Sequence, residues 1–176
     1  MKLEDFNYVL PKELIAQQPA EPRDSCRLLM VDKKTGEWQH RRFRDILDEI
    51  RPGDVFVFNN TKVIPARLFG RRKETGGKVE VLLLIPKGND VWEILVNPGR
   101  KALPGQEIEF SENFSCTVID KTEFGGRLVK FHYSGDFDNW LDQLGEMPTP
   151  PYIHKKLGNK DEYQTVYALS LIHISE

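Results

Sequence analysis

The chain has 176 residues, of which 39% are hydrophobic and 30% charged, and its formal net charge is −2. The composition excludes an intrinsically disordered protein, and the length allows one ordinary domain or two small ones. The near-neutral charge excludes nucleic-acid attraction by a global field, so such binding would need a local basic patch. Because no apolar run approaches the roughly 20 residues of a membrane span and no secretory signal is found, we expect a cytoplasmic protein without membrane contact.

Short helices and one hairpin are predicted in the first fifty residues. A proline followed by good helix formers predicts a short helix over residues 11–16. Residues 27–32 and 38–41 are predicted to pair as a hairpin. Apolar residues at helical spacing then predict an amphipathic helix over residues 43–50, which ends before a Pro-Gly pair.

Residues 55–58 (VFVF) are a continuous apolar run, which predicts a strand buried on both faces. The run ends in Asn59, Asn60 and Thr61, three short polar side chains suited to a turn at the end of a strand. Such a turn is either an ordinary strand-to-loop connection or a place that holds a ligand. Both interpretations stay open at this level.

A basic stretch follows, in which Glu74 is the one acidic residue. Its six cations are Lys62, Arg67, Arg71, Arg72, Lys73 and Lys78. They would suit phosphate groups, with binding that weakens steeply as salt rises. They would equally suit a solvated edge strand, where lysines discourage aggregation.

From residue 66 the sequence becomes rich in short strands. Five such runs, separated by turn residues, are residues 79–85, 91–96, 107–110, 115–119 and 127–133. This spacing predicts a small barrel or a sandwich over residues 66–135. Glu80 lies in the first run, where an unpaired carboxylate is costly, so we expect it to pair with a neighbouring arginine or to point outward. A role as a general base is the lesser alternative.

The last part of the chain combines a helix with a proline-rich segment. Apolar residues at helical spacing predict a helix over residues 136–144, with Gly145 as its C-cap. The prolines of residues 147–153 fix an extended backbone, which is either a plain linker or a way to present Tyr152. Residues 163–167 fit a strand or a loop.

Motifs for common catalytic sites are missing from the sequence. The four histidines have no metal-ligand spacing, so we predict no metal site. Cys26 is expected to be a small buried residue beside a strand rather than a reactive thiol. The residues by themselves therefore indicate a two-part α/β plus β protein with a basic patch, and no named reaction.

Five separated motifs extend the interpretation: LPKELIAQQP, RDSCRLLMVD, HRRFRDILDEIRPGDVFVFNNTKVIPARLFGRRKETGGKVEVLLL, GEMPTPPYI and YQTVYA. In this order and spacing they resemble the S-adenosylmethionine:tRNA ribosyltransferase-isomerase family of queuosine synthesis. The resemblance covers residues 1–168. It implies an α/β fold, in which a larger, three-layer-like α/β domain, incomplete here, carries an inserted small antiparallel β-barrel.

The resemblance also implies a domain layout and a reaction. Residues 1–65 and 136–168 would belong to the α/β domain, residues 66–135 to the barrel, and residues 169–176 to a tail without family match. The reaction is transfer and isomerisation of the ribosyl moiety of S-adenosylmethionine onto 7-aminomethyl-7-deazaguanine at the tRNA wobble position. The product is epoxyqueuosine in tRNA, with release of adenine and methionine. S-adenosylmethionine is the co-substrate, no metal is implied, and we expect a monomer.

Within that reaction, two groups of residues receive expected roles. Asn59, Asn60 and Thr61 are expected to bind the hydroxyl groups of the adenosyl donor. Phosphates of tRNA are expected to contact Arg67, Arg71, Arg72 and Lys73, and Tyr152 is expected to stack on a base of the anticodon loop. The catalytic base is not identified; the sulfonium acidifies the adjacent ribose methylene, so a base of near-neutral pKa would suffice.

The chain departs from the family at two places. Cys26 stands where family members commonly carry serine. After YQTVYA the family continues into a segment containing PTAGLHFT, whereas this chain reads residues 169–176. We interpret these eight residues as an artefact or a natural truncation, and we expect the 176-residue chain to be inactive by itself. The alternatives are a non-catalytic RNA-binding β-barrel module and a fragment that does not fold.

Overall fold

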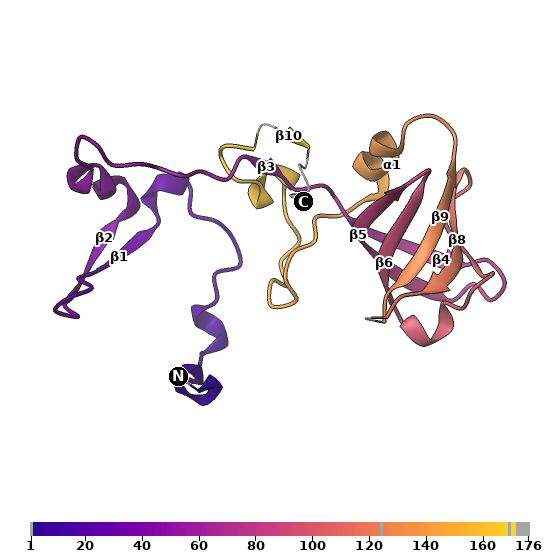
Figure 1. The fold of residues 1–176 in the computed structure, drawn as a ribbon, viewed down its shortest axis with the longest axis horizontal. Helices are drawn as coiled ribbons and strands as arrows, with labels where there is room; N and C mark the ends of the chain where they lie inside the picture. The colour runs from indigo at the N-terminus through magenta and orange to yellow at the C-terminus, as the bar shows by residue number, and fades with distance from the viewer. Residues whose placement is uncertain (1, 124, 169, 172–176) are drawn as a thin grey trace. The chain divides into compact units, whose positions relative to one another are not determined.

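A computed structural model describes residues 2–123, 125–168 and 170–171 of the chain (Figure 1). The chain divides into two compact units. Unit 1 comprises Met1–Phe58 and Pro150–Glu162, and unit 2 comprises Asn59–Thr149 and Tyr163–Glu176. Every buried side chain of the described residues lies in unit 2, which therefore contains the hydrophobic core.

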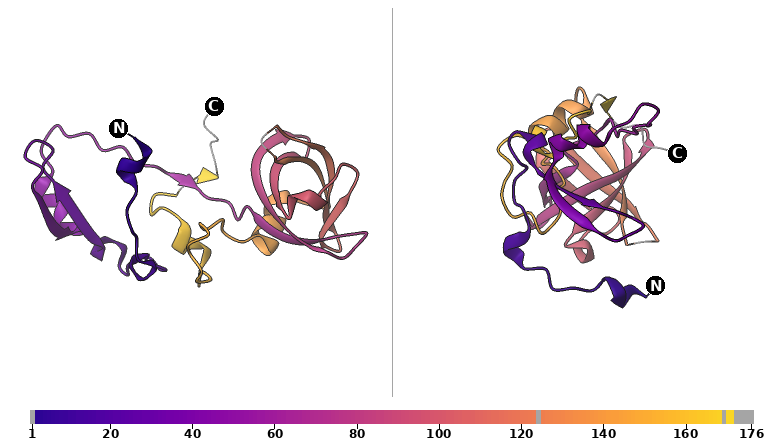
Figure 2. Two further views of the ribbon diagram at one scale, coloured as in Figure 1. Left: turned by 90° about the horizontal axis from the view of Figure 1, so that it is seen from below. Right: turned by 90° about the vertical axis from the view of Figure 1, so that its left-hand side faces the viewer.

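Unit 2 is built on a closed barrel of six antiparallel strands in the order β4-β5-β6-β9-β8-β7 (Figures 1 and 2). The strands are β4 (Arg67–Arg72), β5 (Lys78–Gly88), β6 (Val91–Asn97), β7 (Glu107–Ser111), β8 (Phe114–Lys121) and β9 (Arg127–Tyr133). All five predicted strand runs fall on strands of the barrel. Of the two predicted architectures, the structure therefore confirms the barrel, which leaves no unpaired strand edge.

Strand β4 closes the barrel by pairing with both β5 and β7. The part of the basic stretch that lies on β4 and β5 is therefore not an edge strand, contrary to one of the two interpretations above, whereas Lys62 lies in β3 (Thr61–Lys62) of a two-stranded sheet. Leu68 of this strand is fully buried, whereas the alternating residues Phe69 and Arg71 face outward. At Gly70 a side chain would collide with the Glu109 carbonyl oxygen and the Phe110 ring, so the closing contact with β7 requires glycine.

The two ends of the barrel are closed differently. Helix α1 (Phe137–Leu144) covers one end with aromatic side chains: the Trp140 and Phe114 ring centroids are 5.5 Å apart. Figure 1 shows the short pink helix η5 (Gly99–Lys101) at the other end. The predicted helix is thus confirmed, and Gly145 caps it by donating its N–H to the Leu141 carbonyl oxygen at 2.8 Å.

Unit 1 contains one hairpin and short 3-10 helices. Strands β1 (Arg27–Val31) and β2 (Trp38–Arg42) pair antiparallel, which confirms the predicted hairpin. The 3-10 helices that lie wholly in this unit are η1 (Leu3–Phe6), η2 (Lys12–Leu14), η3 (Arg23–Ser25) and η4 (Phe43–Glu49). The helices predicted at residues 11–16 and 43–50 are therefore present as the tighter 3-10 form, which suits short segments. Within the described residues the predicted α/β domain is not confirmed.

The apolar run at residues 55–58 is not a buried strand, so that prediction was wrong. The run lies outside every strand of the described residues, and the Val57 side chain is 93% exposed. A strand needs neighbours that take up its backbone N–H and C=O groups, and an apolar sequence does not supply them.

Towards the end of the described chain, η6 (Lys160–Tyr163) leads into residues 164–168, which form no strand. Of the predicted tail, Ser170–Leu171 form the short strand β10, and residues 169 and 172–176 lie outside the described residues. No helix among the described residues has the length and apolar character required to cross a membrane.

Candidate functional site

The three predicted adenosyl-binding residues form a turn at the start of unit 2. The Thr61 N–H donates to Asn59 Oδ1 at 2.8 Å, the pattern of an Asx turn. Thr61 begins strand β3 (Thr61–Lys62), which pairs in parallel with β10 (Figure 1). The Asn60 side chain is exposed, and no described residue forms a hydrogen bond with its amide. The geometry of an ordinary turn is therefore present, and it leaves one amide open to a ligand.

Two residues from far along the chain join this turn. Thr165 Oγ1 donates to the Asn59 carbonyl oxygen at 3.3 Å. Gln164 Nε2 donates to the Val63 carbonyl oxygen at 2.7 Å, while Gln164 Oε1 accepts from the Val63 N–H at 2.8 Å. The Gln164 side-chain amide thus bonds both the N–H and the C=O group of Val63, as the backbone of a neighbouring strand would. Sequence reasoning missed both partners; the one signal was that they belong to the fifth motif.

The predicted tRNA-binding cations lie on or directly after β4, but they differ in their surroundings. Arg67 Nε lies 3.0 Å from Glu80 Oε1, and Arg67 Nη2 donates to the Thr149 carbonyl oxygen at 3.0 Å. The expectation that Glu80 pairs with an arginine is confirmed. Arg72 folds over Gly77, where a side chain would collide with the guanidinium group.

Lys73 is held by two carboxylates of β7. Its Nζ lies 2.9 Å from Glu107 Oε2 and 3.7 Å from Glu109 Oε1. The hydrogen bond with Glu107 is the main reason that the pKa of Lys73 is raised, and it lowers the pKa of Glu107. Lys73 therefore keeps its positive charge, but a phosphate would have to compete with two carboxylates for it.

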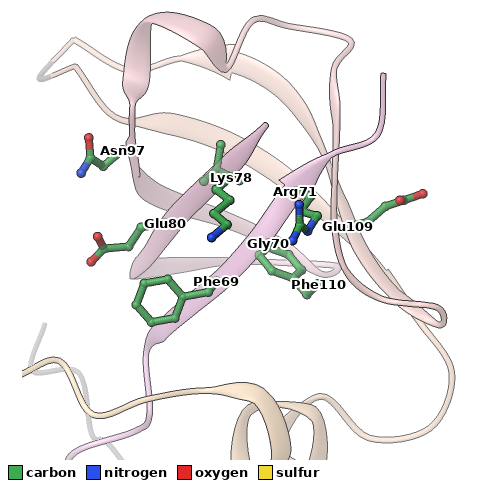
Figure 3. Close-up of a pocket in the computed structure, with 9 residues that line it drawn as sticks. Phe69, Gly70, Arg71, Lys78, Glu80, Asn97, Glu109 and Phe110 are labelled. Carbon is green, nitrogen blue, oxygen red and sulfur yellow. The ribbon is translucent and has the colours of Figure 1, made fainter. Parts of the chain in front are cut away.

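Arg71 faces an open depression of about 540 Å³ on the outside of the barrel (Figure 3). Arg71 Nη1 reaches the Gly76 carbonyl oxygen at 3.4 Å, and Lys78 lies opposite Arg71 in the β4–β5 ladder. Among the four cations predicted to contact tRNA, Arg71 is thus the one that lines open surface without an ion pair to any described carboxylate.

Tyr152 belongs to unit 1, where Gln17 anchors the proline-rich segment. Gln17 Nε2 donates to the Tyr152 carbonyl oxygen at 3.0 Å, and the His154 N–H donates to Gln17 Oε1 at 2.8 Å. The Tyr152 residue is 54% exposed. The segment passes from unit 2 to unit 1 between Thr149 and Pro150, as a linker does, and its unit 1 part is bonded to Gln17. The grouping of Tyr152 with the arginines stays a prediction.

The cysteines and potential metal ligands form no catalytic cluster in the part of the chain that the structure describes. Both cysteines are free: Cys26 is half-buried, whereas Cys116 is buried inside the barrel, where burial raises the pKa of its thiol to about 12. Cys26 is thus less buried than the sequence suggested, because it follows η3 at the surface of unit 1. The described residues contain no group of three or more His, Cys, Asp or Glu side chains that could hold a metal ion.

Comparison with known proteins gives several matches. A sequence profile of the family described as queuosine biosynthesis protein matches residues 3–172. The S-adenosylmethionine:tRNA ribosyltransferase-isomerase of Symbiobacterium thermophilum is 54% identical over 169 residues, which are 96% of this chain and 50% of that protein. The proteins of the same name from Thermoanaerobacter sp. and Heliobacterium modesticaldum are 55% and 48% identical, with the same coverage of 96% and 50%.

The chain therefore spans about half the length of the curated relatives it matches. It is also similar to a solved structure, the crystal structure of S-adenosylmethionine tRNA ribosyltransferase from Thermotoga maritima. The sequences are 40% identical, the TM-score is 0.40, and the match covers 80% of this chain and 48% of that one.

Proposed function

The chain belongs to the queuosine biosynthesis protein family, and from this premise we propose that it supplies one half of an S-adenosylmethionine:tRNA ribosyltransferase-isomerase. The observation that carries the proposal is the identity of 54% and 55%, over 96% of this chain, to two enzymes of that name. The reaction transfers and isomerises the ribosyl moiety of S-adenosylmethionine onto 7-aminomethyl-7-deazaguanine at the tRNA wobble position. Epoxyqueuosine forms in the tRNA, and adenine and methionine leave.

The adenosyl donor is proposed to bind at Asn59, Asn60 and Thr61. The free amide of Asn60 offers two donors and one acceptor to the ribose hydroxyl groups. Since Asn59 is already bonded to Thr61 and Thr165, its role is to fix the turn that presents Asn60. The sulfonium supplies the activation, so the protein's share is positioning and electrostatics.

The tRNA is proposed to contact the basic stretch and Tyr152. The ion pairs described above make Arg71 the strongest phosphate ligand of the set. Arg67 and Lys73 are proposed to contribute less because each pairs with a carboxylate, and Arg72 because its guanidinium lies over Gly77 and does not line the depression. Tyr152 is proposed to stack on an exposed anticodon base.

The wider architecture belongs to the same proposal. We propose that residues 1–65 and 136–168 are parts of a larger α/β domain into which the barrel of residues 66–135 is inserted. The run of strands from Arg67 to Tyr133 supports the barrel segment. The complete enzyme is proposed to be a cytoplasmic monomer that needs no metal.

A chimera tests the proposed function. Residues 1–168 replace the matching segment of the Symbiobacterium thermophilum enzyme, and adenine release is measured with S-adenosylmethionine and tRNA that carries the deazaguanine. We expect adenine release. Asn60→Ala is expected to raise the KM for S-adenosylmethionine, and Arg71→Ala to raise the KM for tRNA. A chimera that binds tRNA but releases no adenine would instead support the non-catalytic RNA-binding module.

A further inference from the structure

The outer surface of strands β4 and β5 carries one exposed aromatic ring, that of Phe69. The structure describes every residue of the six barrel strands, and among their aromatic residues Phe69 alone is exposed, at 52%. The other aromatic side chains of these strands pack into the core or against it. A single exposed phenylalanine needs no explanation by itself, so its surroundings decide what it can do.

Two cations face the same depression as Phe69. Arg71 lies two positions further along β4, on the same face, and Lys78 is its direct neighbour across the β4–β5 ladder (Figure 3). Neither cation forms an ion pair with any carboxylate of the described residues. Arg71 Nη1 donates one hydrogen bond, to the Gly76 carbonyl oxygen at 3.4 Å. Their charge is therefore available to an anion in the depression.

Two carboxylates also line the depression, and each lies near a cation that is not part of its lining. Glu80 pairs with Arg67 at 3.0 Å. Glu109 lies 3.7 Å from Lys73, which is closer to Glu107 at 2.9 Å, and it is the neighbour of Arg71 across the β4–β7 ladder. Figure 3 shows Glu109 pointing away from Lys78 and Phe69. Arg71 and Lys78 are therefore the two cations of the depression that form no ion pair with a described carboxylate.

We propose that Phe69, Arg71 and Lys78 form a binding site for an unpaired nucleotide of RNA. The base stacks on the phenyl ring, and the two cations hold its flanking phosphates, a combination that binds single-stranded segments with little sequence preference. Asn97, which lies opposite Glu80 on β6, offers an amide to the edge of the base. The choice of RNA as occupant rests on the proposed function, since an anticodon loop presents unpaired bases between phosphates.

The test uses the whole 176-residue chain and a fluorescent anticodon stem-loop RNA with an unmodified wobble guanine. Phe69→Leu keeps an apolar side chain but removes the stacking face, so we expect about tenfold weaker binding. Phe69→Tyr is expected to bind as the parent chain does. Trp38→Leu removes a ring from unit 1 that is 65% exposed, against 52% for Phe69, and is the matched control with no expected effect.

A blunt duplex made from the same stem separates stacking from charge. Phe69→Leu is expected to change duplex binding little, because every base pair of the duplex except the two terminal ones is stacked on both faces. Arg71→Ala and Lys78→Ala are each expected to reduce the slope of log affinity against log salt by about 0.7 for the stem-loop. The inference is overturned if the chain does not bind the stem-loop, if Phe69→Leu binds it normally, or if Phe69→Leu weakens both RNAs equally.

Failure of this inference can be told apart from failure of the proposed function. In the chimera, Phe69→Leu is expected to raise the KM for tRNA about tenfold with kcat unchanged. If the chimera is active and Phe69→Leu does not change its KM for tRNA, the nucleotide site is disproved and the proposed function is not affected. If the chimera is inactive but stem-loop binding depends on Phe69, the proposed function is disproved and the nucleotide site is supported.

Discussion

At the scale of single residues, Arg127 is the only charged side chain that is buried among the described residues. Its guanidinium is surrounded by backbone carbonyl groups instead of a carboxylate. Nε donates to the Ala102 oxygen at 2.6 Å, Nη1 to the Gly125 and Gly126 oxygens at 2.9 and 2.7 Å, and Nη2 to the Gly99 oxygen at 2.5 Å. One side chain thus ties the η5 segment to the β8–β9 connection and closes that end of the barrel.

Replacement of Arg127 should therefore be costly. Arg127→Met leaves four buried or partly buried carbonyl groups without their donor, and we expect the free energy of unfolding to fall by about 3 kcal/mol or more. Urea denaturation measures this change. Arg100→Met, an exposed position in η5, is the matched control and should change the value by less than about 0.5 kcal/mol. Equal effects of the two substitutions would contradict the structural role of Arg127.

A second residue-scale prediction concerns Asp90 and Tyr133. Tyr133 Oη donates to Asp90 Oδ1, and this hydrogen bond lowers the pKa of Asp90 and raises the pKa of Tyr133 to about 12. Because the folded pKa of Asp90 is depressed, its contribution to stability is present above the ordinary carboxyl pKa and is lost as the pH falls below that range. Because the folded pKa of Tyr133 is raised, its contribution is complete below pH ~10 and is lost as the pH rises towards 12.

The midpoint of thermal unfolding should therefore fall at both extremes of pH. In Asp90→Asn the midpoint should depend less on pH on both the acid and the alkaline side. In Tyr133→Phe the midpoint should likewise depend less on pH on the alkaline side. Absorbance of the phenolate gives an independent reading, since one tyrosine should ionise well above the others. If all tyrosines of the folded chain ionised together near pH 10, the hydrogen bond would be absent in solution.

At the scale of elements, two glutamines join segments that are far apart in the sequence. Gln17 bonds both to the Tyr152 carbonyl and to the His154 N–H, and Gln164 bonds to both backbone groups of Val63. In each case the side-chain amide donates and accepts, as a strand neighbour does. Each unit therefore contains one such connection. The sequence indicated the order of the motifs along the chain but not which of them are in contact.

These connections depend on both halves of the amide. In Gln164→Glu the carboxylate still accepts from the Val63 N–H but faces the Val63 carbonyl without a donor, so we expect amide exchange at Val63 to be about tenfold faster. Gln17→Glu should have the same effect at His154. Gln106→Glu is the matched control, because Gln106 Oε1 only accepts from the Leu103 N–H, at 3.0 Å, and should change little. Hydrogen exchange followed by NMR separates the three variants.

At the scale of the whole molecule, the two units differ in packing. The core of unit 2 includes Leu68, Ile94, Ile108 and Val129, all fully buried. In unit 1 no described side chain is buried, and Trp38 is 65% exposed. Stability should therefore be concentrated in the barrel.

Hydrogen exchange in increasing urea tests this difference. Amides of β8 and β9 should exchange only through global unfolding, whereas amides of β1 and β2 should exchange through local opening of far lower free energy. In the chimera described above, β1 and β2 should gain protection if the proposed α/β domain is completed there. Equal protection of both regions in the 176-residue chain would contradict the view that the barrel alone carries the core.

By itself the sequence determined the features that depend on near neighbours. The hairpin at β1 and β2, the strand runs between residues 79 and 133, helix α1 and its Gly145 cap all follow from periodicity and turn residues within a few positions. The ordered motifs also sufficed for the family, because a matching order of many residues is specific without coordinates.

Only the tertiary structure decided the features that depend on distant partners. Closure of β4 on β7, the ion pair of Lys73 with Glu107, and the connection of Gln164 to Val63 each join residues more than thirty positions apart. The run at residues 55–58 is a further example of dependence on distant partners: its apolar pattern predicted a buried strand, but no described strand pairs with it and it is exposed. Side-chain type restricts what a residue can do, but burial, pairing and free charge are set by whichever residues the fold brings beside it.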